Sequence, residues 1–330
     1  MSIGRRDFFK VISAGAVTAA TAGPIFAREK KKLSPDAVGI LYDATLCIGC
    51  KLCEVGCKEY NEMPPEQSTL VDDLNVPTIW DNGDDLSAKT LNKIKLYRNG
   101  DTSVKDRATD GYSFIKRACM HCVDPDCVSA CPVTALEKNP VTGVVTYDAK
   151  ACIGCRYCQV ACPFNVPKFE WDDPFPKIVK CQMCDHVQKS GGIPGCCHYC
   201  PTGASLYGNV EDLMNEAHKR IEMNEGSKYN YQVKSMECGE TAQHTVPKYV
   251  HYVYGEKETG GTQYMILSAV PFHELGLPKL PEKSAAGKSE TIQHTIYKGL
   301  IAPGVLLAGL FVAVYRSNKT HNKSKEGRTE

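Results

Sequence analysis

The chain has 330 residues, with 39 Lys and Arg against 38 Asp and Glu, so its net charge at pH 7 is +1. This balance excludes the strongly basic surface that nucleic-acid-binding proteins use. Hydrophobic residues make up 42% of the chain, as in ordinary soluble domains. The mean hydropathy is -0.29 and there is only one long apolar run near the C-terminus, which excludes a multi-spanning channel.

Residues 1–27 have the pattern of a Tat-type export signal. Arg5 and Arg6 precede Phe8 and Lys10, and a stretch rich in Ala, Gly and Val then runs to Ala27. A basic N-terminal helix is the alternative, but it explains neither the order of these residues nor the small residues after them. Because the Tat route carries folded proteins, cofactors can be inserted in the reducing cytoplasm before export to an oxidising compartment.

Sixteen of the eighteen cysteines fall into four blocks, within a predicted cluster domain at 36–223. Blocks one and three have the spacing C-x2-C-x2-C-x3-C, block two has C-x2-C-x4-C-x3-C, and block four has a longer middle gap. A proline follows the last cysteine of blocks two, three and four. The blocks are Cys47, Cys50, Cys53 and Cys57; Cys119, Cys122, Cys127 and Cys131; Cys152, Cys155, Cys158 and Cys162; and Cys181, Cys184, Cys196 and Cys200.

These spacings predict iron–sulfur clusters. In the bacterial ferredoxin run C-x2-C-x2-C-x3-C-P, three cysteines hold one [4Fe–4S] cube and the fourth holds the neighbouring cube. Structural zinc uses paired C-x2-C units, which does not explain the third cysteine of blocks one and three. Disulfide scaffolds also have even numbers of cysteines, but they are usually short chains. Four blocks therefore predict four cubes and a role in electron transfer.

The spacing also predicts how the blocks share their cubes. Blocks two and three are nearly adjacent, so we pair them, and blocks one and four then form the outer pair. The fold class expected is α+β, with two nested ferredoxin-like modules. The predicted ligand sets are Cys47, Cys50, Cys53 and Cys200; Cys181, Cys184, Cys196 and Cys57; Cys119, Cys122, Cys127 and Cys162; and Cys152, Cys155, Cys158 and Cys131.

Two cysteines remain outside these sets. Cys197 competes with Cys196 as a ligand, but only Cys196 keeps the x3 spacing to Cys200. Cys238 has no partner motif and is interpreted as a buried thiol.

Secondary structure around the blocks follows from local patterns. Residues about 69–110 are rich in Asp, Asn and Gly and are interpreted as an insertion loop with one strand at 93–98. A strand at 112–117 leads into block two, and a turn at 141–143 followed by a strand at 144–148 predicts a hairpin between blocks two and three. After block four we expect a strand at 203–207, a helix at 211–223 and a wrapping extension at 224–290 with a strand at 262–270.

Residues 297–315 are predicted to be a single transmembrane anchor. Lys298 and Arg316 bracket a charge-free run of 17 residues, close to the shortest length that spans a bilayer. A buried core helix is the alternative. Basic residues in the tail at 316–330 predict a cytoplasmic C-terminus by the positive-inside rule. The cluster domain then lies on the periplasmic face of the inner membrane, as the export signal requires.

No catalytic motif is recognised, so no catalytic residue is assigned and the chain is interpreted as a non-catalytic subunit. His121 and His198 lie inside cysteine blocks, where a contact to a ligand sulfur is conceivable. His294 lies near the membrane entry. For each of the three, a satisfied or exposed histidine is the favoured interpretation.

The order of the four blocks resembles the four-cluster electron-transfer subunits of respiratory oxidoreductases, such as formate dehydrogenase and dimethyl sulfoxide reductase. The whole chain is most similar to the iron–sulfur subunit of hydrogenase-2-type enzymes. The motifs that carry this resemblance are LYDATLC at 41–47, CMHCVDP at 119–125, CRYC at 155–158, HTVPKY at 244–249, YGEKE at 254–258 and IQHTIYKG at 292–299. One departure is Lys58, which stands where a proline would follow block one.

This resemblance implies partners. It implies the small and large subunits of a nickel–iron hydrogenase, which oxidise hydrogen, and a multi-spanning membrane subunit that reacts with quinone. The chain would relay electrons between them. The alternative is the equivalent relay of a formate dehydrogenase or of a sulfur-compound or dimethyl sulfoxide reductase.

Overall fold

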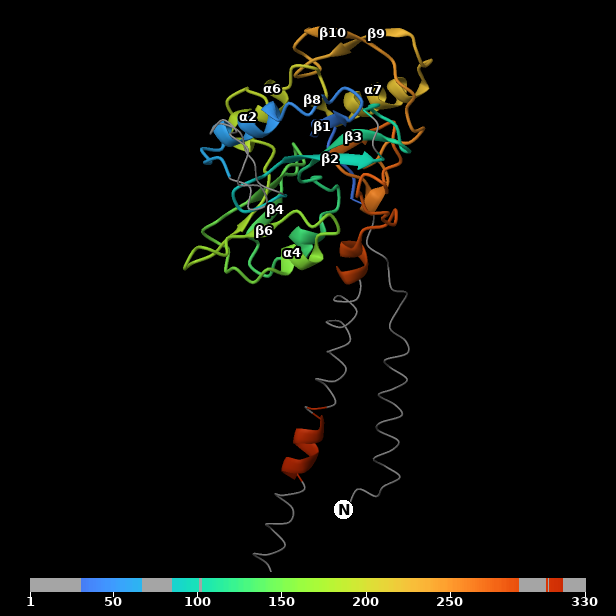
Figure 1. Cartoon of the computed structure of the whole chain (residues 1–330). Coiled ribbons are helices and arrows are strands. Elements are labelled where there is room, and N and C mark those ends of the chain that lie inside the picture. Colours follow the sequence, from blue (N-terminus) through green and yellow to red (C-terminus); the bar gives the residue numbers. More distant parts are fainter. Residues whose placement is uncertain (1–30, 67–84, 101–102, 291–306, 308, 317–330) are drawn as a thin grey trace, which may run out of the picture. The chain divides into compact units, whose positions relative to one another are not determined.

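The computed structural model describes residues 31–66, 85–100, 103–290, 307 and 309–316 (Figure 1). The chain divides into two units, one formed by Lys30–Ala286 and the other by Met1–Glu29 with Gly287–Glu330. The first unit is a mixed α/β domain that contains all eighteen cysteines. It has no boundary near 223, so the predicted cluster domain and extension belong to one unit.

The centre of this unit is a three-stranded sheet in the order β11-β1-β8. Strand β1 (Val38–Asp43) is antiparallel to β8 (Ser205–Asn209) and parallel to β11 (Tyr264–Leu267). Because β1 precedes block one and β8 follows block four, this pairing brings the two outer blocks to the same end of the sheet. Strand β11 is apolar and buried along its whole length, and β1 is buried at every position after Val38, as is usual for strands covered on both faces.

Helix α7 (Val210–Glu222) packs on one face of this sheet. The Asn209 side chain caps its start by accepting a hydrogen bond from Glu211 N at 2.8 Å. Leu213, Ala217 and Ile221 are buried on one face, as the helical periodicity predicted. The helix predicted at 211–223 is therefore confirmed, and its apolar face closes one side of the core.

Four two-stranded sheets surround the centre. The pairs are β2 (Lys93–Asn99) with β3 (Gly111–Arg117), β4 (Leu136–Lys138) with β5 (Val145–Tyr147), β6 (Lys168–Phe169) with β7 (Ile178–Val179), and β9 (Lys228–Gln232) with β10 (Thr241–Thr245). The strands predicted at 93–98 and 112–117 and the hairpin between blocks two and three are confirmed. The strand predicted at 262–270 is shorter, and the sequence analysis missed β1, the β6–β7 pair and the β9–β10 hairpin.

Short helices carry or follow the cysteines. They are α2 (Leu52–Tyr60), α3 (Asp126–Ser129), α4 (Tyr157–Ala161), α5 (Asp185–Gln188) and α6 (Gly195–His198), with a 3-10 turn η1 (Glu258–Gly260). Helix α2 of block one packs against α6 of block four, and α3 of block two packs against α4 of block three. At the α2–α6 crossing a Cβ on Gly56 would lie 2.7 Å from Gly195 O, so this close approach requires glycine.

The extension at 224–290 does more than wrap the domain. It supplies β11 to the central sheet, and Val246, Tyr249 and Val253 are buried with the apolar face of α7. The sequence analysis did not predict this contribution. The strand in the central sheet has only four residues, and the segment around it is rich in Tyr, Gly and Lys.

In the second unit, residues 309–316 are helical, and Leu310, Phe311 and Val314 are exposed. Within the described residues, no helix is both long and apolar enough to cross a membrane. Most of the predicted anchor at 297–315, the predicted export signal at 1–27 and His294 lie outside the described residues.

Candidate iron–sulfur centres

All four cysteine blocks share one backbone feature, a positive φ at the second residue after the first cysteine. These residues are Gly49 (φ 72), His121 (φ 45), Gly154 (φ 69) and Met183 (φ 53). A left-handed residue turns successive N–H groups into a common hollow, the nest found at many iron–sulfur sites. Gly154 N accordingly donates to Cys152 Sγ at 3.4 Å, and Met183 N donates to Cys181 Sγ at 3.3 Å. The blocks are thus shaped to surround an anionic group.

The first predicted set lines one pocket, here called the first pocket. Its thiols are Cys47, Cys50, Cys53 and Cys200, and its other walls include Tyr42, Ile94 and Ser205. Block four thus contributes its last cysteine to a site built by block one. Burial raises the pKa of the Cys47 and Cys53 thiols, because a thiolate is poorly solvated there.

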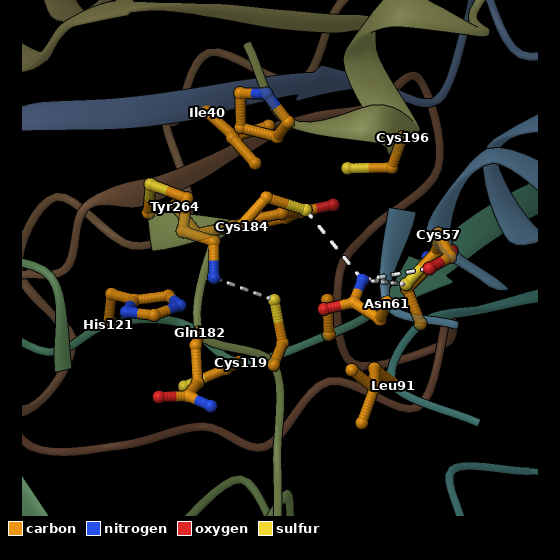
Figure 2. A pocket seen from close by; sticks show the side chains of 15 residues that line it. Ile40, Cys57, Asn61, Leu91, Cys119, His121, Gln182, Cys184, Cys196 and Tyr264 are labelled. Carbon is orange, nitrogen blue, oxygen red and sulfur yellow. Dashed lines mark hydrogen bonds between the residues drawn. The ribbon is translucent and has the colours of Figure 1, made fainter. Parts of the chain in front are cut away.

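The second predicted set lines a different pocket, the second pocket (Figure 2). Its thiols are Cys57, Cys181, Cys184 and Cys196, so block one returns its fourth cysteine to block four. Cys119 of block two also lines this pocket, which places the third predicted set directly beside it. Burial and the neighbouring thiols raise the pKa of Cys57 and Cys181.

The side-chain amide of Asn61 lies near two thiols of the second pocket (Figure 2). Its Nδ2 lies 3.8 Å from Cys57 Sγ and 3.7 Å from Cys184 Sγ, and it donates to Cys57 O at 2.8 Å. Hydrogen bonds to ligand sulfurs are one of the levers on cluster potential. The sequence analysis missed Asn61, although its place four residues after Cys57, at the end of a helix, puts it on the cysteine's face.

Electrostatic interactions link the thiols of the third predicted set. Burial raises the pKa of Cys122, and the adjacent thiols of Cys119, Cys162 and Cys127 raise it further. Burial and thiols that include Cys119 and Cys162 raise the pKa of Cys127 to about 12, against the lowering effect of Lys180. The four sulfurs are therefore close enough to repel one another as thiolates.

The fourth predicted set lines the fourth pocket, formed by Cys131, Cys152, Cys155 and Cys158. This site lies near the surface, since Ile153 beside it is 65% exposed and Val160 on α4 is 86% exposed. Burial works to raise the pKa of Cys152, but the nearby Tyr147 hydroxyl and the hydrogen bond from Gly154 N outweigh it and lower the pKa.

Cys196 and Cys197 are both buried, but they face different surroundings. Cys196 lines the second pocket and Cys197 does not. A hydrogen bond from the Cys197 thiol lowers the pKa of Cys196, and the nearby Lys116 ammonium lowers it further. This geometry favours Cys196 as the ligand, with Cys197 as a donor to it.

Lys116 on β3 is a buried cation between the first and second pockets. Its side chain is 1% exposed, and its Nζ donates to Ser205 Oγ at 3.0 Å. Burial alone would lower the pKa of Lys116, but the thiols of Cys196 and Cys53, one from each pocket, raise it. The sequence analysis missed Lys116 because it treated this residue as a polar position of the predicted strand at 112–117.

The donor chemistry of these sites fits iron–sulfur cubes. All eighteen cysteines are free thiols, and burial disfavours their thiolate forms unless cations compensate. Four thiolates on one zinc ion would lie about 3.8 Å apart, given the usual Zn–S distance. Within the described residues, no group of three or more His, Cys, Asp or Glu side chains could hold a single metal ion. Cysteines that each bind a different corner of a cube need no such close convergence.

The second pocket also contains two buried donors without an acceptor. The Nε2 atom of His121 and the hydroxyl of Tyr264 have no hydrogen-bond partner among the described residues. Both side chains line this pocket. Buried polar groups are nearly always paired, so these two donors point to an acceptor that occupies the pocket.

The remaining sequence candidates are Cys238, His198 and His121. Cys238 is exposed, not buried as expected. His198 is exposed as favoured, and its Nδ1 lies 2.7 Å from Tyr60 Oη. His121 departs from expectation, because it is 1% exposed and only one of its two ring nitrogens is satisfied.

Comparison with known proteins agrees with this chemistry. The family described as "4Fe-4S dicluster domain" matches residues 111–210, which hold blocks two, three and four. The domain is therefore of the ferredoxin type and binds iron–sulfur clusters.

The chain is 45% identical over 323 residues to the hydrogenase-2 operon protein HybA of Escherichia coli O157:H7, with 96% of each chain covered. The protein of the same name from Shigella flexneri matches equally well. The iron–sulfur subunit of the nitrate-inducible formate dehydrogenase of Escherichia coli K12 is 30% identical over 281 residues, with 84% of this chain and 82% of that one covered. The resemblance inferred from the motifs is confirmed, and the chain belongs to the family of the hydrogenase-2 operon protein HybA.

Proposed function

We propose that this chain is the electron relay of a nickel–iron hydrogenase complex, passing electrons from the hydrogenase subunits to a quinone-reacting membrane subunit. The observation that carries this proposal is that cysteines from separate blocks gather into four sites. Four [4Fe–4S] cubes would provide one-electron carriers at these sites. The proposed ligands are Cys47, Cys50, Cys53 and Cys200; Cys57, Cys181, Cys184 and Cys196; Cys119, Cys122, Cys127 and Cys162; and Cys131, Cys152, Cys155 and Cys158.

The ligand sets form a continuous series through the domain. Cys53 of the first set and Cys196 of the second are close enough for the Cys196 thiolate to raise the pKa of Cys53. Cys119 of the third set lines the second pocket. Cys158 of the fourth set raises the pKa of Cys127 in the third. This proximity supports transfer from one proposed cube to the next.

A relay in a formate dehydrogenase complex is the second candidate. The identity of 30% to a formate dehydrogenase subunit supports it, but the identity of 45% to HybA over 96% of each chain favours the hydrogenase. Purification of the complex under anaerobic conditions distinguishes the two. Nickel in the copurified large subunit supports the hydrogenase, whereas molybdopterin there supports the formate enzyme.

We further propose that the cluster domain lies in the periplasm and is anchored by the segment 297–315. The twin arginine at 5–6 and the charge-free run of 17 residues before Arg316 support this location. Replacing Arg5 and Arg6 by Lys should leave the precursor in the cytoplasm with its clusters. Export of that variant would contradict the proposed signal.

Iron analysis tests the number of cubes. We expect about 16 iron atoms per chain, four for each complete set of thiols. EPR spectra of the reduced protein should account for four interacting [4Fe–4S] centres. Two centres, or zinc in a fixed ratio to protein, would contradict the assignment.

Truncation before Tyr297 tests the relay. The truncated chain should keep its clusters, because no proposed ligand lies beyond Cys200. Hydrogen oxidation with a soluble dye should persist, since the hydrogenase subunits can reduce the dye directly, whereas hydrogen-dependent quinone reduction should fall sharply. Unchanged quinone reduction after deletion of the whole chain would contradict the relay.

A further inference from the structure

We propose that His121 and Tyr264 donate hydrogen bonds to sulfur atoms of the cube in the second pocket and thereby raise its reduction potential. This inference rests on the proposed four-cube relay and assigns to two residues a role that the ligand sets do not include. The cube takes up one electron, and no bond forms or breaks at either residue.

The tautomer of His121 is determined by its surroundings. Its Nδ1 accepts a hydrogen bond from Val145 N at 3.0 Å. A neutral imidazole carries its proton on the other nitrogen when Nδ1 is the acceptor. The Nε2–H group is therefore a donor, yet it has no partner among the described residues, and the side chain is only 1% exposed.

Tyr264 is held equally firmly. It lies on β11 in the central sheet, paired in register with Ile40 of β1, and it is 1% exposed. Its hydroxyl likewise has no acceptor among the described residues. Neighbouring groups that perturb the pKa of Tyr264 include Cys196 and Lys116, so its hydroxyl lies near the thiols and the buried cation between the two pockets.

The two donors share the second pocket with Asn61, which lies across it (Figure 2). Asn61 already donates toward Cys57 Sγ and Cys184 Sγ at 3.8 and 3.7 Å. A buried donor without an acceptor is strongly disfavoured. The acceptor available in this pocket is sulfur, either the thiolate of a cysteine or the sulfide of the cube. Donors that face sulfur stabilise the reduced cube, because reduction adds negative charge to it.

Conservative variants separate the donor from the packing of each side chain. In His121→Asn the side-chain oxygen takes the position of Nδ1 and keeps the bond to Val145 N, but no donor reaches the pocket. In His121→Gln the amide takes the position of Nε2 and retains the donor. Asn also tolerates the left-handed backbone of residue 121, which has φ 45. Tyr264→Phe removes only the hydroxyl, and Tyr254→Phe is its control, since Tyr254 donates instead to Pro278 O at 2.7 Å.

The measurement is a redox titration followed by EPR on the full-length protein in its complex. We expect His121→Asn and Tyr264→Phe each to lower the reduction equilibrium constant of one cube about tenfold, which is about 59 mV for a one-electron couple. His121→Gln and Tyr254→Phe should leave all four potentials unchanged. Electron–nuclear double resonance should lose one exchangeable-proton coupling in each of the two affected variants.

The experiment distinguishes failure of the donor roles from failure of the proposed four-cube relay. An iron content well below about 16 atoms in the unmodified chain would contradict the four cubes. Full iron content with unchanged potentials in both donor variants would overturn the role of His121 and Tyr264 alone. Equal shifts in all four cubes would also overturn it, because that result indicates a general structural change.

Discussion

Blocks one and three have the same spacing and nearly the same sequence, yet the structure places them in different environments. Both begin Cys-Ile-Gly-Cys, and in both a left-handed basic residue, Lys51 or Arg156, precedes the helix. In block one, Glu54 is buried, pairs with Lys93 at 2.9 Å and accepts from Ile94 N at 2.7 Å. In block three, the matching residue Gln159 is only partly buried and the next residue, Val160, is 86% exposed.

The difference shows that the same cysteine motif can lie in two different environments. Helix α2 packs against α6, and Glu54 on α2 bonds to Lys93 and Ile94 of β2. Three of the four cysteines in each of the first and second pockets are buried. Helix α4 packs against the short helix α3, and three of the four cysteines of the fourth pocket are only partly buried. Since solvent exposure and hydrogen bonds tune cluster potentials, we expect the two ends of the series to differ in potential and in reactivity.

The largest effect should come from the buried end of the series. Cys196→Ala removes a proposed ligand of the second cube, so we expect iron to fall from about 16 to about 12 atoms per chain and one EPR component to disappear. Cys197→Ala is the matched control, since its thiol lies next to the ligand but outside the pocket. Retention of all iron in Cys196→Ala, or loss of a cube in Cys197→Ala, would reverse the ligand assignment.

A smaller effect concerns the matched positions 54 and 159. Glu54→Ala leaves the ammonium of Lys93 without its buried carboxylate, so we expect a loss of about 3–5 kcal/mol in the free energy of unfolding. Gln159→Ala should cost less than about 0.5 kcal/mol, as is usual for surface substitutions. Anaerobic denaturant titrations of the cluster-loaded protein measure both. Equal costs at the two positions would remove the distinction between the enclosed and open ends.

The smallest effect is a difference in the rate at which the cubes of the unmodified protein are lost on oxidation. On brief exposure to an oxidant, the cube proposed for the fourth pocket should be lost before that of the second pocket, because three of its four cysteines are only partly buried. The cube of the second pocket should be lost last, because its thiols are enclosed. Iron content and EPR spectra at successive times measure the order. Loss of the second-pocket cube first would contradict the comparison.

The sequence alone determined the local features of this protein. Cysteine spacing predicted the four blocks and favoured Cys196 over Cys197 as a ligand, because both inferences depend on residues close together in the chain. Periodicity predicted α7, β2, β3 and the hairpin between blocks two and three. The motifs also identified the family, which the identity of 45% to HybA confirms.

Only the tertiary structure decided what surrounds each site. Lys116 reaches Cys53 and Cys196, and Tyr264 reaches the second pocket, from strands far from those cysteines in the sequence. The proposed donor role of His121 depends on a hydrogen bond from Val145 on β5. The unequal burial of blocks one and three is also absent from their nearly identical sequences. Spacing acts within one turn of the chain, whereas burial and hydrogen bonding depend on which distant segments pack against that turn.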